Sequence, residues 1–572
     1  MPAIDRRELL DALTWLDGYY KSAEGLGRPE GLSRGGKPDF EAIAAWGLDV
    51  FLGSRLAGLD VDTSRRNVMH LIEQTMEWKS KHRTVGETPF TQFSSPVPVD
   101  RSELLIALLR LDVFYRSWSG LQRPDGLSKN GRPDFEAVAA WIFDVYLNSR
   151  LANRSPEDAW DDVVAAIMKE EEWRRRSASR VPVDASTLHG KHLVGYQGWF
   201  YTPNDGASNG WGHWFRGPAT AENANFDLWP DTREFFDSEL EPTEMTYGNG
   251  QRARLFSSYN PRVVQRHFDW LADNQIDGVS IGRFLAGTSD PSTRQRLDRV
   301  LTNVRAAAEG SGRVFFVWYD VSDNPPNSLV ANLKIDWRHI VDGNVTSSPS
   351  YLWHAGKPFV GIWGAGAGGR AGSPLEWIEM IGFVRDNPDP RYRATLLISG
   401  IRNWRDDPTW APIFERADVV APWAVTAFTD HAGADAYSKN VLEPDLASTR
   451  ARRQGYLPIV FPGFSWHNLQ GARSMLNEIP RRGGRFYWRQ VYNAINAGAD
   501  ALFTAMYDEL DEGTAIMKAA ATQADVPAQG TFLSLDADRE LLPSDWYLRL
   551  AGAATKALRR EIALSAEIPI EP

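Results

Sequence analysis

From residue 188 onward, short apolar segments alternate with longer segments in which apolar residues recur at helical spacing. Eight of the short segments are rich in β-branched and aromatic residues, which is typical of buried strands. They span 192–200, 278–284, 313–321, 357–364, 393–400, 418–425, 456–466 and 499–509. Helical patterns occupy the intervals between them, including 261–274, 292–309, 374–386 and 485–497. Eight strands alternating with helices predict an α/β fold, a (β/α)8 barrel of the TIM type.

The chain before the barrel contains a tandem repeat. Residues 6–58 recur at 101–153 with a constant offset of 95 positions. Apolar residues fall on helical faces in both copies, and each copy is predicted to form three helices. We therefore expect an all-α region made of repeat 1 (1–85), a linker (86–100) and repeat 2 (101–176). A second linker (177–188), the barrel (189–560) and a C-terminal tail (561–572) follow.

The loop shared by the two repeats allows two interpretations. Its Gly, Pro and Ser residues can form a turn that caps the next helix. Alternatively, the duplicated module binds a glycan or a cell-envelope partner. We assign the repeats to no family, and both interpretations stay open.

The composition excludes several classes of chemistry. Without cysteine, the 572-residue chain has no disulfide, thiolate nucleophile or Cys-ligated metal centre. A net charge of −11 without a compensating basic cluster makes nucleic acid an unfavourable partner. No apolar run is long enough to span a membrane, and charged residues interrupt the first 25 positions, where a signal sequence would lie. We therefore expect a cytoplasmic protein, or an extracellular or periplasmic one if a leader has been removed.

The 23 tryptophans favour a carbohydrate ligand, because indole rings pack well against the apolar faces of sugars. In a (β/α)8 barrel the functional side chains lie at the C-terminal ends of the strands. Those ends carry the candidate substrate-binding residues Tyr196, Trp199, Arg283, Tyr319, Asp320, Trp363, Arg402, Trp423, Trp466, His467 and Asp508. Arg283 and Arg402 would bind an anionic sugar or orient nearby glutamates. His467 would bind a sugar hydroxyl or form a structural hydrogen bond.

The last predicted strand runs into the segment YDELDEGT (507–514), which contains four carboxylates. Glu509 and Glu512 can converge if the chain turns there, and Gly513 permits a turn. Crowded carboxylates do not ionise together, so one keeps a proton while the other is charged. Glycoside hydrolysis needs this division into an acid and a base or nucleophile. The alternative is that the acidic run only caps a helix N-terminus. The ten histidines show no metal-binding spacing, and we expect no metal and no cofactor.

The segment YDELDEGT resembles the E-x-x-E-G-T signature of glycoside hydrolase family 99, the endo-α-mannosidases. It is also similar to the D-x-x-E end of family 71, the α-1,3-glucanases. The phrases GYQGWF, WYDVS and PGFSWHN resemble bacterial proteins of this type that are called xylosidase/arabinosidase. The resemblance covers about residues 190–520.

The resemblance to family 99 implies that Glu509 deprotonates the sugar 2-hydroxyl and that Glu512 is the general acid/base. In the family 71 view, Glu509 takes the place of an Asp and the configuration at the anomeric carbon is inverted. The chain differs from family 99 at Leu510-Asp511, where an aromatic residue and usually a His lie. The sequence thus predicts a glycoside hydrolase acting on a poly- or oligosaccharide. The alternative is a non-catalytic glycan-binding barrel whose helical repeats bind partners.

Overall fold

The computed structural model describes residues 181–572 apart from 207–209, 237–238, 326 and 369–371. Before residue 181 it describes only short stretches: 33–34, 37–38, 50–51, 54, 59–60, 62–68, 70, 128–129, 132–133, 145 and 162. The chain divides between residues 175 and 176 into two compact units.

The described part of the N-terminal unit contains the same small hairpin in each repeat. Strands β1 (Ser33–Arg34) and β2 (Lys37–Pro38) pair antiparallel, and so do β3 (Ser128–Lys129) and β4 (Arg132–Pro133). The residues that pair in the second hairpin are those of the first hairpin shifted by 95 positions, so the repetition in the sequence is also present in the strand pairing. The hairpins lie in the loop that the sequence predicted. The three helices predicted for each repeat fall mostly outside the described residues.

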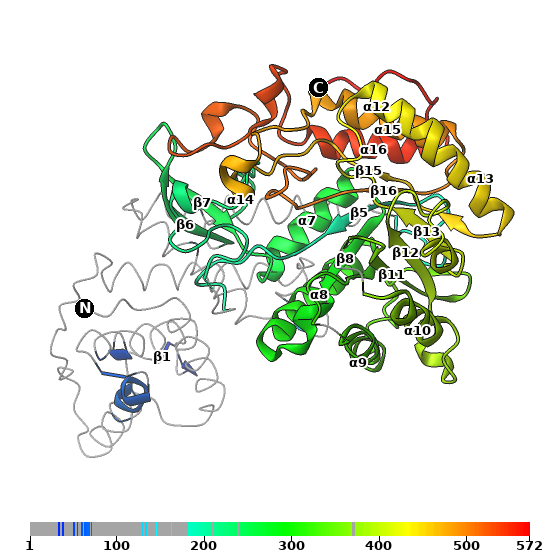
Figure 1. Cartoon of the computed structure of the whole chain (residues 1–572). Coiled ribbons are helices and arrows are strands. Elements are labelled where there is room, and N and C mark those ends of the chain that lie inside the picture. Colours follow the sequence, from blue (N-terminus) through cyan, green and yellow to red (C-terminus); the bar gives the residue numbers. More distant parts are fainter. Residues whose placement is uncertain are drawn as a thin grey trace, which may run out of the picture. The chain divides into compact units, whose positions relative to one another are not determined.

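Eight parallel strands close the barrel of the second unit (Figure 1). Their order along the chain is β5 (His192–Tyr196), β8 (Gly278–Phe284), β9 (Val314–Asp320), β11 (Lys357–Ala365), β12 (Thr395–Gly400), β13 (Val419–Pro422), β14/β15 (Gly455–Tyr456 and Ile459–Val460) and β16 (Leu502–Thr504). Each strand pairs with the next, and β16 pairs with β5. The segments β14 and β15 act as one strand, because β14 pairs with β13 and β15 with β16. All eight predicted strands are present, and the predicted (β/α)8 class is confirmed.

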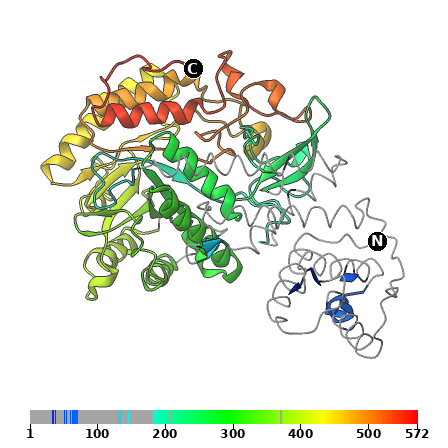
Figure 2. The ribbon, with the colours of Figure 1, turned by 180° about the vertical axis from the view of Figure 1, so that it is seen from behind.

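Helices follow the strands and cover the outside of the barrel. They are α7 (Pro261–Asp273), α8 (Pro291–Ser311), α9 (Leu329–Asp342), α10 (Pro374–Arg385), α11 (Ala411–Phe414), α12 (His431–Tyr437), α13 (Glu443–Ala451), α15 (Arg485–Asn496) and α16 (Trp546–Leu558). Figure 2 shows α7 beside α8, and α15 beside α16. The side chains of Asn260, Asp290 and Ser373 cap α7, α8 and α10, each before a proline that suits the first helical turn.

Tryptophan serves mainly as core in this unit. Trp214, Trp229, Trp337, Trp377, Trp404, Trp488 and Trp546 are fully buried. Four of them lie on outer helices, Trp337 on α9, Trp377 on α10, Trp488 on α15 and Trp546 on α16, whereas Trp214 and Trp229 belong to the insertion after β5. Burial of such large apolar side chains stabilises the fold. The high tryptophan content is therefore only in part a sign of sugar binding.

Two features of the barrel unit were not predicted. The connection between β5 and α7 carries a hairpin of β6 (Leu240–Thr246) and β7 (Arg252–Phe256), beside the short helix α14 (His467–Gln470) in Figure 1. The C-terminal tail packs on the barrel through Ile562, Leu564, Ile568 and Ile570. Within the described residues, no helix has the length and apolar character needed to cross a membrane.

Candidate active site

The segment after β16 turns back on itself and brings Glu509 and Glu512 to one place. The backbone N–H of Thr514 donates to the carbonyl of Glu509 at 3.1 Å, and Gly513 has a φ of +62°. The buried Arg481 donates through Nη2 to the carbonyls of Gly513 and Ala515, both at 2.7 Å. The predicted turn at Gly513 is therefore present, and an arginine behind it holds its shape.

Glu509 is held by hydrogen bonds at both carboxylate oxygens. The side-chain amide of Gln197 donates to Oε1 at 2.6 Å, and the hydroxyl of Thr514 donates to Oε2 at 3.0 Å. The residue is 5% exposed. Burial raises the pKa of Glu509, as do the negative charges of Glu512 and Asp511, while the bond from Gln197 lowers it.

Glu512 is half-buried, beside the indole of Trp466. Burial, with the negative charges of Asp511 and Asp320, raises its pKa to about 8, although contact with the Trp466 indole lowers it. Two neighbouring carboxylates do not both ionise readily, so the ionisation of Glu509 opposes that of Glu512.

The other two carboxylates of this segment have different surroundings. Asp508 is fully buried and accepts the backbone N–H groups of Gln197 and Gly198, both at 2.8 Å. Both of its oxygens thereby tie the end of β16 to the end of β5, and its role in binding substrate stays a prediction. Burial raises the pKa of Asp508 to about 7. Asp511 accepts from Nδ1 of His213 at 3.0 Å. We call Asp508, Glu509, Asp511 and Glu512 the acidic cluster.

Four of the predicted tryptophans lie half-buried at the C-terminal ends of their strands. Trp363 and Trp423 meet edge to face, with ring centroids 6.0 Å apart. Trp199 lies after β5, and Trp466 after β15. The indole N–H groups of Trp199 and Trp363 find no hydrogen-bond partner within the described part of the chain. Buried donors without partners are costly, which is why such groups at a rim are candidates for binding a ligand hydroxyl.

Three predicted substrate-binding residues belong to the core. Tyr196 is completely buried, and its hydroxyl bonds to His267 at 3.0 Å. The guanidinium of Arg283 binds Asp336 through two hydrogen bonds of 2.6 and 2.7 Å, and the Tyr319 hydroxyl donates to the same carboxylate at 2.8 Å. These hydrogen bonds run from the strands towards helices α7 and α9. Arg283 also donates to Asp298 at 2.7 Å. A role of the three residues in binding substrate stays a prediction.

The remaining predicted residues are placed at the rim with separate partners. Asp320 accepts the backbone N–H of Ser322 at 2.7 Å and lies close enough to Glu512 to raise its pKa. The Nδ1 atom of His467 bonds to the carbonyl of Ser474 at 3.0 Å, which is the structural hydrogen bond that the sequence left open. Arg402 is exposed in the connection after β12.

Several residues that shape the site were not predicted. Gln197 and Thr514 both lie inside the recognised phrases, GYQGWF and YDELDEGT, so those phrases carried a usable signal. Asp227 is fully buried in the insertion after β5 and accepts the backbone N–H groups of His467 and Asn468, both at 2.7 Å. No pattern in the sequence links Asp227 or His213 to the acidic cluster.

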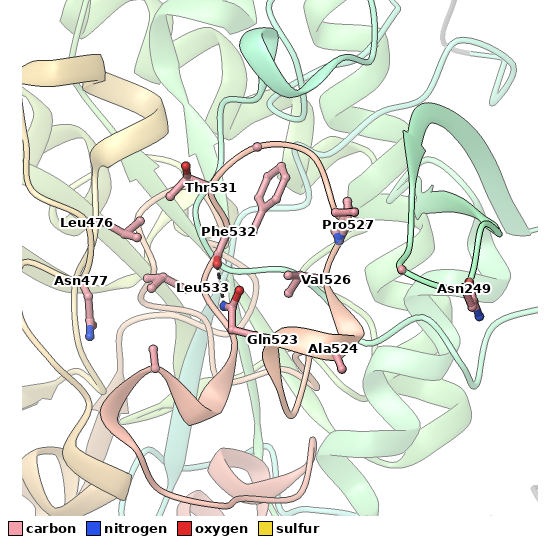
Figure 3. Close-up of a pocket in the computed structure, with 14 residues that line it drawn as sticks. Asn249, Leu476, Asn477, Gln523, Ala524, Val526, Pro527, Thr531, Phe532 and Leu533 are labelled. Carbon is pink, nitrogen blue, oxygen red and sulfur yellow. Dashed lines mark hydrogen bonds between the residues drawn. The ribbon is translucent and has the colours of Figure 1, made fainter.

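A broad cavity of about 830 Å³ lies elsewhere (Figure 3). It is lined by the turn after β6, by Leu476 and Asn477, and by residues 523–537. Neither Glu509 nor Glu512 lines it. Among the described residues, no group of three or more His, Asp or Glu side chains is arranged to hold a metal.

Comparison with known proteins gives structural likeness without sequence likeness. No protein-family model matches the chain, and no curated protein matches its sequence. Its structure is similar to a family 99 endo-α-mannosidase from Bacteroides thetaiotaomicron in complex with bis-tris-propane, with 16% identity, a TM-score of 0.49, and 66% of this chain and 99% of that chain covered. A second structure of a family 99 endo-α-mannosidase from this organism has 17% identity and a TM-score of 0.48, covering 65% and 99%. A family 5 glycoside hydrolase from Streptomyces cattleya, in complex with Manβ1-4GlcNAc, has 13% identity and a TM-score of 0.34, covering 53% and 77%. Likeness of this degree assigns no activity to the chain, and the function has to be argued from the acidic cluster.

Proposed function

We propose that the barrel is a glycoside hydrolase that cleaves a poly- or oligosaccharide with Glu509 and Glu512. The observation that carries this proposal is the unequal environment of two neighbouring glutamates. Glu509 accepts hydrogen bonds on both oxygens, an arrangement that suits a carboxylate. Burial and the neighbouring carboxylates raise the pKa of both glutamates, that of Glu512 to about 8, so the pair retains a proton for donation near neutral pH. One charged and one protonated carboxyl group is what glycoside hydrolysis requires.

The roles follow from this assignment. Glu512 donates its proton to the leaving oxygen as the bond from that oxygen to the anomeric carbon breaks. Glu509 takes a proton from the nucleophile, which is either the neighbouring 2-hydroxyl, as in the family 99 route, or a water molecule. In the first case water then attacks the anomeric carbon of the anhydro sugar, Glu512 takes a proton from that water, and Glu509 returns its proton to the 2-oxygen as the bond from that oxygen to the anomeric carbon breaks, so the configuration is retained. In the second case the configuration is inverted.

The surroundings of the pair support a neutral sugar as substrate. Within the described residues, no lysine or arginine forms an ion pair with Asp508, Glu509, Asp511 or Glu512. The cluster therefore repels a carboxylated or sulfated sugar. The half-buried Trp199, Trp363, Trp423 and Trp466 offer apolar surface and indole N–H groups of the kind that bind sugar rings.

The test is release of reducing ends from α-mannan, α-glucan, arabinan, xylan and arabinogalactan. We compare the wild type with Glu512→Gln and Glu509→Gln, each expected to lose at least about a hundredfold in kcat. Glu415→Gln is the control, because Glu415 is an exposed glutamate paired with Arg452. Proton NMR of the first product formed then distinguishes retention from inversion.

The outcomes separate enzyme from binding protein. Hydrolysis that is lost in Glu512→Gln but kept in Glu415→Gln supports the proposal. Binding to one of the same glycans without hydrolysis, unchanged by either glutamate substitution, supports the non-catalytic glycan-binding barrel instead.

A further inference from the structure

His213 is held in an unusual position beside the acidic cluster. Its ring lies flat against Trp199, with centroids 4.1 Å apart and an interplanar angle of 4°. Its Nδ1 bonds to Oδ2 of Asp511 at 3.0 Å. Its backbone has a φ of +58°, a left-handed conformation that is uncommon outside glycine but that histidine adopts more often than most residues.

Asp511 is the buried end of this pair. Its side chain is 2% exposed, whereas that of His213 is 40% exposed. The second carboxylate oxygen of Asp511 finds no partner within the described residues. The charge of Asp511 contributes to the raised pKa values of Asp508, Glu509 and Glu512. Asp511 therefore acts on the whole cluster.

The charged groups around this pair are almost all acidic. Asp508, Glu509 and Glu512 lie on the same segment after β16, and Asp320 acts on Glu512 from the end of β9. In the described part of the chain, the only ion-pair partner of Asp511 is His213, which comes from the insertion after β5. His213 is thus the group best placed to offset the charge of Asp511.

We propose that His213 is a positioning residue of this site, which offsets the charge of Asp511 and thereby lets one of the two glutamates ionise. This inference rests on the proposed glycosidase function for its consequence, but its physical basis is independent of any substrate. The stacked Trp199 fixes the imidazole plane, so that Nδ1 faces Asp511.

Two substitutions should then act in opposite directions. Asp511→Asn removes a negative charge, so the pKa values of Glu509 and Glu512 fall, by about 1 or more. His213→Phe keeps an aromatic ring against Trp199 but leaves Asp511 uncompensated, so both values rise. His213→Asn returns a donor near the position of Nδ1 and should reverse part of that rise. His189→Phe is the control, because His189 forms a similar bond of 2.6 Å with Asp500. These two residues precede β5 and β16, whereas Gln197 and Glu509 follow the same strands.

The titration can be followed without a substrate, through the carboxyl carbons of 13C-labelled glutamate in the full-length protein. Two glutamates should titrate far above the usual range, and their midpoints should move down in Asp511→Asn and up in His213→Phe. Unchanged midpoints in both variants would overturn the proposal, as would movement of both in the same direction. His213→Asn and Asp511→Asn keep the test informative if His213→Phe does not fold.

The same variants separate this proposal from the proposed function. If hydrolysis is found, both limbs of the pH–activity profile should move with the midpoints, whereas a purely structural role would lower activity without moving them. If no glycan is hydrolysed but the midpoints move in opposite directions, the role of His213 stands and the glycosidase proposal fails. If hydrolysis is found and the profile does not move, the role of His213 fails alone.

Discussion

Gln197 donates its side-chain amide to Oε1 of Glu509 at 2.6 Å, across 312 positions of sequence. The bond joins the end of the first barrel strand to the segment after the last one, where β5 and β16 lie side by side. It is charge-assisted when Glu509 is ionised, so it favours the charged form of that carboxyl group. The closure of the barrel thus creates the environment of the proposed base.

We expect Gln197→Leu to move the acidic limb of the pH–activity profile to higher pH. The bond from Gln197 lowers the pKa of Glu509, so its loss raises that pKa, and a higher pH is needed to ionise the base. At a pH below the limb, activity should fall about tenfold each time the pKa of Glu509 rises by 1. Gln265→Leu is the control, since Gln265 donates to Asp269 within α7. A lower maximal activity with no shift of the acidic limb along the pH axis would contradict this role of Gln197.

Glu512→Gln should stabilise the protein at neutral pH while it abolishes activity. The pKa of Glu512 is about 8 in the fold and near 4.5 in the unfolded chain, so the native state holds a proton that the unfolded chain releases. Stability therefore falls as pH rises from about 4.5 to 8, and a neutral glutamine removes this cost, which is at most about 3 kcal/mol at pH 7. Urea unfolding at pH 4.5 and pH 7.5 measures the difference. Equal stabilities of variant and wild type at pH 7.5 would argue against the raised pKa.

Asp227→Asn should disturb the segment that carries Trp466. Asp227 accepts three hydrogen bonds, from the hydroxyl of Ser465 and from the backbone N–H groups of His467 and Asn468. An asparagine would turn an N–H towards one of these donors, at a cost of about 1–3 kcal/mol. We expect lower unfolding free energy and lower kcat/KM, because Trp466 contacts Glu512.

Asp389→Asn is the control for Asp227→Asn. Asp389 accepts the backbone N–H of Arg391 at the surface. A variant of Asp227 with the stability and activity of the wild type would show that the Trp466 segment does not depend on this carboxylate.

Gly513→Ala should displace the turn between the two glutamates. A Cβ at Gly513 would lie 3.0 Å from both the Cβ and the backbone nitrogen of Ser465, and the φ of +62° is itself unfavourable for alanine by about 1–2 kcal/mol. Gly356 has a φ of +74° with open space around it, so Gly356→Ala carries the backbone cost alone. Thermal unfolding and hydrolysis of both variants isolate the effect of crowding at Ser465. Equal losses would mean that Ser465 can move aside.

The barrel could be predicted because its signals are local. A buried parallel strand is recognised by apolar side chains over a few consecutive residues, and an amphipathic helix by apolar residues that recur at helical spacing within about twelve residues. The predicted segments 278–284 and 261–274 therefore match β8 and α7 closely. The hairpin of β6 and β7 was missed because it lies in a long insertion where Pro242 and charged residues obscure the alternation. Sequence spacing also placed Glu509 and Glu512 on one turn.

The direction of each side chain depended on the closed barrel. Tyr196, Arg283 and Tyr319 occur at strand ends, as sugar-binding residues would. In the structure, Arg283 and Tyr319 form hydrogen bonds with Asp336 on α9, and Tyr196 forms one with His267 on α7. Nothing near Arg283 in the sequence indicates a partner 53 positions away. A one-residue change in strand register or twist exchanges inside and outside, so only the packed structure decides this.

The sequence by itself determined the alternation of strands and helices, the tandem repeat and the crowding of four carboxylates after the last strand. These depend on residues close together in the chain. The tertiary structure decided how those carboxylates differ: Asp508 is tied to backbone N–H groups, Glu509 to Gln197, Asp511 to His213, and Glu512 is left half-buried near Trp466. The physical reason is that a proton affinity is set by burial and by charges within a few ångströms, and those neighbours come from distant parts of the chain.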